Sequence, residues 1–418
     1  MIRSRIKTQN MEFILISIYI TSKMLWDKIP YIFEWLFWLM ILWNAGNYIC
    51  PLLQKRRINR YLIHIEMFIV YVLINGIMQD STIVLIRSIY ELIIYMMVML
   101  YFLQVRKKIN LLYCLKEIVI WGAIISVLTW FEYITKHYIL TDLSGYGQIL
   151  FVGNNGFRAT VFSRSFLSHG IVLGIFTMIG LYIWYVSRKK RYLILGMFAY
   201  SAILATGSRG PLVAFFVAIV FFYYYDVFLI RKKRIKKYRF IAVGIVLGLL
   251  IITILNLNVD PTTSSMSYFI YRIQNIFNWT GDAGNVGRIL IWKKSLNNWF
   301  VKSPIFGIGP SKTGSWGDAS LGVTESGILK RLCELGMVGT LMFYSLIFYI
   351  IRKSTKIKNK GNKKEMALWL SIFLGIFIND ITVQSTEEIM VAFWLWCSLG
   401  GILYLKQQDK LELREINR

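Results

Sequence analysis

Charged residues are scarce in this chain. Asp, Glu, Lys and Arg make up 17% of its 418 residues, whereas 56% are hydrophobic; ordinary globular domains are roughly a quarter charged. A water-soluble fold of this composition would expose a large apolar surface, so a soluble protein is excluded. Apolar runs near the length of about 20 residues that crosses a bilayer recur from end to end, separated by short charged connectors. The pattern predicts a bundle of helices in lipid.

Acidic residues are especially few, 22 against 48 Lys and Arg, which gives a formal net charge of +26. Such a balance can indicate nucleic-acid binding. Here, however, the basic residues cluster in every second connector, as the positive-inside bias requires. We therefore expect both termini in the cytoplasm, contact with anionic membrane lipid and no nucleic acid. Most Lys and Arg residues lie in these clusters: 3–7, 55–60, 106–108, 188–191, 231–239, 352–364 and the tail from Lys406.

Cysteine and histidine are also rare, with four and three residues. None of them is spaced like a metal ligand, so we expect neither a metal nor another cofactor, and we interpret the cysteines as small buried hydrophobic residues. The first apolar run lacks a small-residue cleavage site after it and is expected to remain as the first helix.

The apolar runs predict an all-α polytopic membrane protein with about 12 transmembrane helices, organised as a single membrane domain over residues 1–418. The expected spans are 12–26, 30–50, 61–79, 82–104, 111–135, 164–187, 191–206, 210–230, 239–257, 327–351, 365–383 and 388–405.

Two connectors on the predicted outer side are long, residues 136–163 and residues 258–326, and long loops in a compact bundle usually carry function. The larger one has apolar residues at helical spacing over 266–277 and again over 289–300. We expect two short amphipathic helices on the outer membrane surface. Pro304, Gly307 and Gly309 would stop the second one.

Arginine is disfavoured on the outer side, so its occurrences there are informative. Arg209 lies in TGSRGP (206–211), at an outer turn that opens a helix, where free backbone N–H groups and a guanidinium together favour an anion. A snorkelling arginine at a helix end is the alternative. Ser208 and Gly210 flank Arg209, and glycine favours close approach by a ligand.

Three more arginines share this placement. Arg288, in GRILIW (287–292), opens the second amphipathic helix of the large loop, although it could instead contact lipid headgroups. Arg158 and Arg164 flank the end of the first long loop. Together the four outer arginines indicate a polyanionic ligand such as a lipid-linked diphosphate.

Glu325, in TESG (324–327), stands at the mouth of the tenth predicted span. A carboxylate there can act as general base for an acceptor hydroxyl. Alternatively it is a helix-start glutamate favoured by the helix dipole. Inside the spans, Arg87 and Glu91 are four residues apart and are expected to neutralise each other.

The ordered set of segments resembles the O-antigen ligase and polymerase superfamily of bacterial membrane glycosyltransferases. The segments are 205–210, Gly287 and Arg288 with Trp292, SPIFGIGP (303–310) and 325–339. The resemblance implies that Arg209 and Arg288 bind the diphosphate of an undecaprenyl-diphosphate-linked glycan. Ligases of the family carry His, a polar residue, nine residues, then Gly and Gly three further on; here Ser326, Gly336 and Gly339 match, but Glu325 replaces the His.

This departure favours a polymerase of capsule or O-antigen repeat units in the bacterial cytoplasmic membrane. It would be a metal-independent glycosyltransferase with Arg209, Arg288 and Glu325 as catalytic residues and Arg158, Arg164, Ser208, Gly210 and Trp292 as substrate-binding residues. Its partners would be the lipid-linked donor and acceptor, with a chain-length regulator and a flippase alongside. A ligase with another acceptor and a flippase that makes no bond are the alternatives.

Overall fold

The computed structural model describes most of the chain, and all regular structure in the part that it describes is helical. That part comprises residues 2–22, 32–54, 60–78, 82–140, 157–163, 165–225, 260, 263, 267, 270–271, 274–275, 283–313, 324–352, 357 and 359–416. Its helices are α1 (Ile2–Thr21), α3 (Ile32–Gln54), α4 (Arg60–Ile77), α5 (Thr82–Ser88), the π-helix η1 (Ile89–Ile94), α6 (Tyr95–Val105), α7 (Leu111–Thr135), α8 (Phe166–Ser187), α9 (Lys190–Ala205), α10 (Arg209–Tyr224), α13 (Ala283–Lys302), α14 (Gly327–Arg352), α15 (Lys360–Thr382), the 3-10 helix η6 (Ser385–Glu387) and α16 (Ile389–Ile416).

Every predicted span except 239–257 overlaps these helices, and span 82–104 covers three of them, α5, η1 and α6. Span 239–257 lies outside the described residues. Within the described part, eight helical segments are long and apolar enough to cross a membrane. The prediction of a helical membrane protein is therefore confirmed, whereas the count of twelve spans stays a prediction. The eight segments are 35–54, 60–77, 85–105, 111–135, 166–187, 327–352, 361–382 and 389–412.

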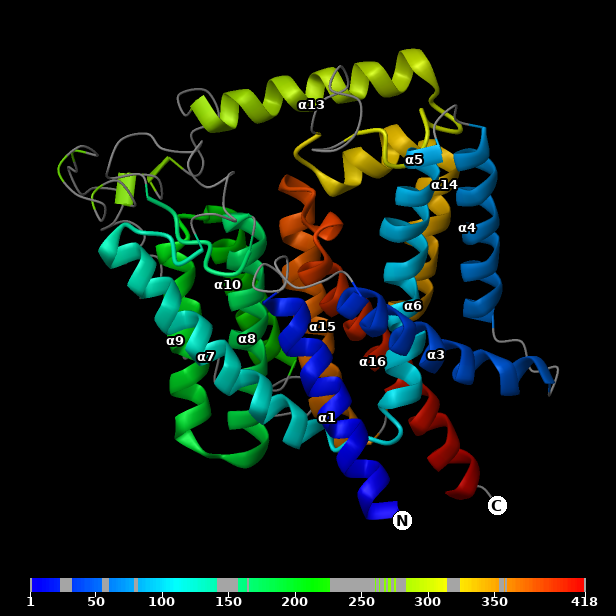
Figure 1. The fold of residues 1–418 in the computed structure, drawn as a ribbon, viewed down its shortest axis with the longest axis vertical. Coiled ribbons are helices and arrows are strands. Elements are labelled where there is room, and N and C mark those ends of the chain that lie inside the picture. Colours follow the sequence, from blue (N-terminus) through cyan, green and yellow to red (C-terminus); the bar gives the residue numbers. More distant parts are fainter. Residues whose placement is uncertain are drawn as a thin grey trace.

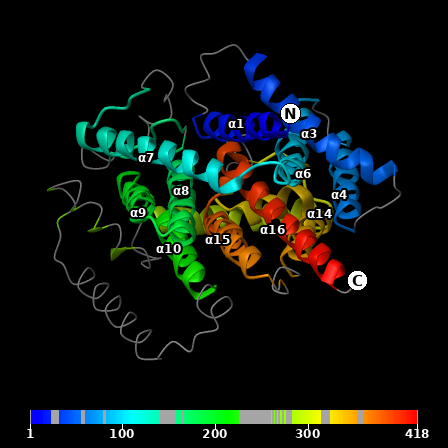
Figure 2. The ribbon, with the colours of Figure 1, turned by 90° about the horizontal axis from the view of Figure 1, so that it is seen from below.

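The helices form a bundle with α13 lying across one end, and both chain termini lie at the opposite end (Figure 1). The end at which α13 lies is called the α13 end below. Seen from below, α7, α8, α9 and α10 stand on one side, α3, α4, α6 and α14 on the other, and α15 between them (Figure 2). This middle position brings α15 into contact with both α10 and α14.

Burial follows the composition of each helix. α8 and α16 are apolar all round and are buried almost all round, as expected for helices surrounded by other helices. α4 instead exposes Ile63, Met67 and Ile74 on one side, which suits a helix that faces lipid tails. α8 and α9 cross at Gly180 and Gly196, where a Cβ on Gly180 would lie 2.7 Å from the Gly196 Cα. Glycine at both positions permits this close approach.

One interpretation of the cysteines was wrong. Cys114, Cys333 and Cys397 are buried, as expected, but Cys50 is exposed near the end of α3. The reason is that α3 exposes much of its surface, including Trp43 and Leu53, so a small apolar residue on it is not necessarily covered by protein. α3 also runs obliquely to α4 and α6 in Figure 1.

The larger outer connector contains α13, which corresponds to the second predicted amphipathic helix. Its side facing the bundle carries Trp292, Ser295 and Trp299, whereas Leu290, Phe300 and Val301 are exposed. The first predicted amphipathic helix, over 266–277, falls mostly outside the described residues.

Candidate functional site

The start of α13 and the segment before α14 meet at the α13 end of the bundle. Arg288 Nε donates to Glu325 Oε2 over 3.0 Å, which also makes an ion pair, and both side chains remain partly exposed. One helical turn further along α13, Trp292 Nε1 donates to the Glu325 backbone carbonyl over 3.2 Å. Two residues of α13 thus hold the side chain and the backbone of Glu325, and the pair stays accessible to a ligand.

Glu325 lies two residues before α14, and its side chain pairs with Arg288. Ser326 is the residue whose side chain reaches the first turn of α14, since its Oγ accepts from Leu329 N over 3.4 Å. Glu325 instead has a φ of +47°, in the left-handed region that a residue with a Cβ rarely adopts. Such strain costs on the order of 1–3 kcal/mol and persists only where neighbours hold the residue in place.

Those neighbours include Thr324. Its Oγ1 donates to Gln384 Oε1 over 2.9 Å, and its backbone N–H donates to the same oxygen over 3.3 Å. Gln384 belongs to the connector between α15 and α16, so the segment before α14 is held from that side as well as from α13. The carboxylate of Glu325 is therefore presented by a fixed backbone.

α14 bends sharply at Gly336, and the bend joins it to the loop after α13. Gly336 has a φ of +65° and Gly307 a φ of +78°. A Cβ on either glycine would overlap backbone atoms of the other segment. Because both lack a Cβ, the two backbones exchange hydrogen bonds, among them Ile308 N to Cys333 O over 2.9 Å and Met337 N to Pro304 O over 3.0 Å. The glycines of the two sequence segments thus have a packing role.

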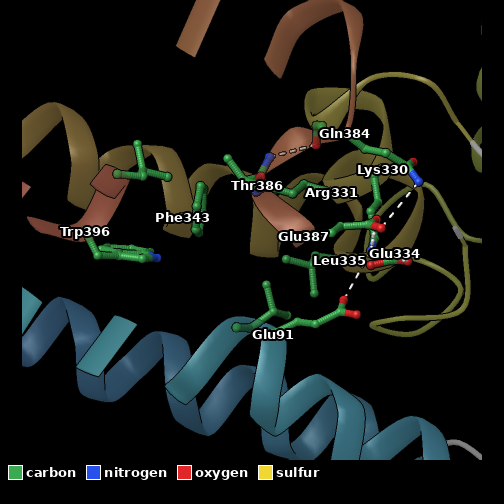
Figure 3. A pocket seen from close by; sticks show the side chains of 13 residues that line it. Glu91, Lys330, Arg331, Glu334, Leu335, Phe343, Gln384, Thr386, Glu387 and Trp396 are labelled. Carbon is green, nitrogen blue, oxygen red and sulfur yellow. Dashed lines mark hydrogen bonds and ion pairs between the residues drawn. The ribbon is translucent and has the colours of Figure 1, made fainter. Parts of the chain in front are cut away.

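The part of α14 before this bend carries a lysine surrounded by carboxylates (Figure 3). Lys330 Nζ lies 3.2 Å from Glu91 Oε2 and 3.8 Å from Glu334 Oε1, and it also pairs with Glu387. Glu91 makes the predicted pair with Arg87, over 2.7 Å. A cavity of about 30 Å³ is lined by Lys330, Glu91, Glu334 and Glu387, which are called the lysine cluster below. This volume suits one or two water molecules and not a sugar. The lysine cluster therefore has a role in holding α14.

The lysine cluster also reaches the loop after α13. Thr313 donates to Glu334 Oε1 through its backbone N–H over 2.8 Å and through its hydroxyl over 2.7 Å. Ser311 Oγ donates to Glu91 Oε2 over 3.2 Å. Two of the three carboxylates around Lys330 therefore bind this loop as well as the lysine.

Three carboxylates face Lys330 and Arg87, so full ionisation would leave a net negative charge in a buried place. Burial raises the pKa of Glu387 to about 7, Lys330 acts in the opposite direction, and the neighbouring Glu91 and Glu334 raise the pKa further. Near neutral pH, Glu387 thus exists in both protonation states. A proton on Glu387 brings the lysine cluster closer to neutrality.

The next residue, Arg331, makes a second buried ion pair. Its Nη1 donates to Asp380 Oδ2 of α15 over 2.9 Å, and its Nη2 donates to Thr386 Oγ1 over 2.6 Å. Thr386 in turn donates to Asp380 Oδ1 over 3.0 Å. α14 is thereby attached to α15 and to the connector after it.

Arg209 opens α10, as predicted, and Pro211 lies in the first helical turn. Arg209 Nη1 donates to the Asn275 backbone carbonyl over 3.2 Å, and Asn285 Nδ2 of α13 donates to the same oxygen over 3.2 Å. Asn285 is three residues before Arg288 on α13. One carbonyl thus links the arginine of α10 to the part of α13 that carries the other arginine.

The two neighbours of Arg209 make protein contacts. Ser208, almost fully buried, donates from Oγ to the Phe166 carbonyl over 3.1 Å and makes no side-chain cap to α10. Gly210 packs against α15, where a Cβ would lie 2.8 Å from Asn379 Oδ1. Their roles in binding a substrate stay predictions.

Arg158 contacts the first residue of α8 and the turn before α10. Its guanidinium lies over the Phe166 ring, 4.3 Å from the centroid, and its Cγ would be 3.2 Å from a Cβ on Gly207. The neighbouring Ala159 N donates to Ala205 O over 3.1 Å. Arg158 thus reaches the turn that carries Arg209, while Arg164 lies outside the described residues.

Residues 194–344 match the family described as O-antigen ligase, a range that includes Arg209, Arg288 and Glu325. This part of the chain is similar to the O-antigen ligase superfamily. It is also 23% identical over 268 residues to a Rickettsia conorii protein whose provisional name is polysaccharide ligase, a match that covers 59% of each chain. The chain thus spans about three fifths of that relative's length.

The several apolar helices, together with the match to the O-antigen ligase family, indicate a multi-pass membrane protein. The matched region runs from α9 into α14 and so contains both arginines, the strained glutamate and the bend at Gly336. Asn275 accepts a hydrogen bond from Arg209, Asn285 donates to the same carbonyl, and Asn379 of α15 lies against Gly210; these three residues were not singled out from the sequence. In the sequence, Asp380 stands out only as an acidic residue within an apolar run.

Proposed function

We propose that this protein is a polysaccharide polymerase that joins undecaprenyl-diphosphate-linked repeat units of an O-antigen or capsule on the outer face of the cytoplasmic membrane. The contact between Arg288 and Glu325 supports the proposal, because it brings an arginine and a carboxylate together where both are partly exposed, and the proposed chemistry needs a cation for the diphosphate and a base for the acceptor. Arg209 adds a second cation through the link at Asn275. In this proposal the α13 end of the bundle is the outer side, and both termini are cytoplasmic.

The proposed reaction transfers the growing glycan from its lipid diphosphate to a hydroxyl of the incoming lipid-linked repeat unit. The acceptor oxygen forms a bond to the anomeric carbon of the donor, and the bond from that carbon to the phosphate oxygen breaks. Undecaprenyl diphosphate leaves with the electron pair, and the acceptor proton passes to Glu325. Arg288 and Arg209 stabilise the charge that develops on the leaving diphosphate.

The pairing of Arg288 with Glu325 suits this sequence of events. When a phosphate oxygen takes the place of the Glu325 carboxylate on Arg288, the carboxylate is released toward the acceptor hydroxyl. Binding of the donor would then prepare the base. Trp292 holds the backbone carbonyl of Glu325, and Gln384 holds the preceding residue, Thr324, during the exchange. Arginine supplies the positive charge in this proposal, and no metal is required.

A ligase is the second candidate, because the matching family and the Rickettsia conorii relative are both named for ligase activity. The ligase would transfer the glycan to an acceptor other than a lipid-linked repeat unit. Glu325 at the position of the ligase histidine favours the polymerase. The identity of the acceptor distinguishes the two.

The test is to incubate the purified protein with the lipid-linked repeat unit of its host in detergent with EDTA and to separate the products by size. A polymerase yields a ladder of longer lipid-linked glycans. Arg288→Ala should abolish the ladder, while Lys293→Ala, which removes an exposed cation from the same helix, should retain it. If folded protein and authentic substrate give no ladder, the polymerase proposal is wrong; a product that appears only with a different acceptor supports the ligase.

A further inference from the structure

Two adjacent side chains at the end of α15 contact the starts of two other helices. Asn379 lies against Gly210, the second residue of α10, and its Oδ1 would be 2.8 Å from a Cβ there. Asp380 lies against Gly327, the first residue of α14, where a Cβ would overlap the carboxylate. The helix that begins with Arg209 and the helix that follows Glu325 therefore both pack against the dipeptide Asn379–Asp380.

We infer that Asn379 and Asp380 are positioning residues that set the separation between Arg209 and Glu325. The kinetic part of this inference rests on the proposed function; the geometric part does not. Neither residue needs to touch a substrate. Each acts through the helix start that it contacts.

Of the two side chains, Asp380 is the one that makes hydrogen bonds to other described residues. It is 3% exposed and receives Arg331 Nη1 over 2.9 Å and Thr386 Oγ1 over 3.0 Å. Arg331 also donates to the Gly327 carbonyl over 2.8 Å. The first turn of α14 is thus held by Arg331 of the same helix and by Asp380 of α15. Glu325 precedes this turn by two residues.

Asn379 contacts α10 in a different way. It is 1% exposed, and neither its Oδ1 nor its Nδ2 has a hydrogen-bond partner within the described part of the chain. Burying an amide without hydrogen bonds lowers the free energy of unfolding, and an apolar residue of similar size would avoid this loss of stability. Its shape against Gly210 gives a reason for its presence, since a glycine and a flat carboxamide allow α10 to start close to α15.

The other contacts between α10 and the Glu325 segment run through the connector before α13, at Asn275. α15 supplies a more rigid route because it is a continuous helix in the middle of the bundle (Figure 2). Moving either helix start by about 1 Å can reduce a rate on the order of 100-fold. Such a loss should appear in kcat more than in KM, because binding contacts are retained while the reacting groups are misaligned.

The geometric test measures the separation of the helices directly. Nitroxide labels are attached to Val213→Cys on α10 and Met337→Cys on α14, both exposed positions, in a Cys50→Ser background that removes the exposed native cysteine. Pulsed electron paramagnetic resonance then gives the distance distribution. Asn379→Leu and the double variant Asp380→Asn with Arg331→Met should each shift or broaden it. Ser371→Ala, a fully buried polar position on the same helix, should not.

The kinetic test uses a pair of size changes. Gly210→Ala should lower kcat because its methyl group meets Asn379. Asn379→Ala should lower kcat because α10 loses the side chain against which its first turn packs. Combining them should restore part of the activity, since the new methyl group occupies space that the shortened side chain leaves. Independent structural defects would instead add to each other.

Unchanged distance distributions in both α15 variants would overturn the inference, as would additive losses in the double variant. If the distributions change as expected but even the wild-type protein makes no lengthened glycan, the positioning of the two helix starts is supported and the proposed function fails. The two results are separable because the distance measurement needs no substrate.

Discussion

The Nε of Arg288 lies 3.0 Å from Oε2 of Glu325, although 37 residues separate them in the chain. The contact joins the start of an amphipathic helix to the segment that opens a candidate membrane span. It brings together the proposed anion-binding group and the proposed base, and it leaves both partly exposed. If a phosphate oxygen of the donor replaced the Glu325 carboxylate as the partner of Arg288, donor binding would release the base.

The role of Glu325 can be tested by replacing only its ionisable group. Glu325→Gln keeps the size but cannot accept a proton, so kcat for glycan extension should fall by about 10²- to 10⁴-fold. Glu325→His supplies a base in the ligase frame and should retain more activity than Glu325→Gln. Initial rates of extension measure both. Equal activity of Glu325→Gln and wild type would exclude a base at this position.

The Glu387 carboxyl should make the stability of the protein depend on pH. Its pKa is about 7 in the fold, above an ordinary glutamate value of about 4.3. The folded state therefore binds more protons between these values, and its stability falls as pH rises through 7. The melting temperature in detergent should decrease from pH 5 to pH 8, and Glu387→Gln should flatten this dependence. An identical pH profile in the variant would contradict the assignment of the proton to Glu387.

Removing the central lysine alone should be more harmful than removing it together with two of its carboxylates. Lys330→Met leaves Glu91, Glu334 and Glu387 buried together, and loss of one partner of a buried pair costs about 3–5 kcal/mol. Lys330→Met combined with Glu91→Gln and Glu387→Gln should recover part of that stability. Thermal unfolding in detergent compares the two. A triple variant less stable than Lys330→Met would show that the carboxylates stabilise the fold without the lysine.

The bend of α14 requires glycine at two contacting positions. Gly336→Ala and Gly307→Ala should each lower the melting temperature, because the new Cβ meets backbone atoms and because both residues have positive φ. Gly46→Ala in α3 is the matched control, since nothing lies within 4 Å of a Cβ there. It should leave the melting temperature unchanged or raise it. A wild-type melting temperature for Gly336→Ala would mean that the loop after α13 can move away from α14.

Much of the fold could be predicted because the signals are local. Hydrophobic length alone placed α7 at 111–135, where the structure has it, and it placed the start of α14 at residue 327. The segments that resemble the O-antigen ligase superfamily also predicted Arg209, Arg288 and Glu325 as parts of one site. The structure joins Arg288 to Glu325 directly and relates Arg209 to them through Asn275 and Asn285.

The sequence left two readings of Glu325 open because a carboxylate at a helix start suits a cap and a base equally well. The structure shows which groups Glu325 contacts, and its role as a base stays a proposal. A φ of +47° turns the Glu325 side chain toward Arg288, and Ser326 takes the capping position. Dihedral angles at a single residue depend on neighbours from other helices, here Trp292 and Gln384, and local propensity does not contain that information.

Composition and periodicity were sufficient to determine that this chain is a helical membrane protein, because the free energy of placing about 20 apolar residues in lipid depends on those residues alone. The partners of its buried polar groups were decided by the tertiary structure. Lys330 of α14 pairs with Glu91 of η1, and Asp380 of α15 pairs with Arg331 of α14. These contacts depend on which helices are neighbours in space, and a buried polar group is stable only when that arrangement supplies its counterpart.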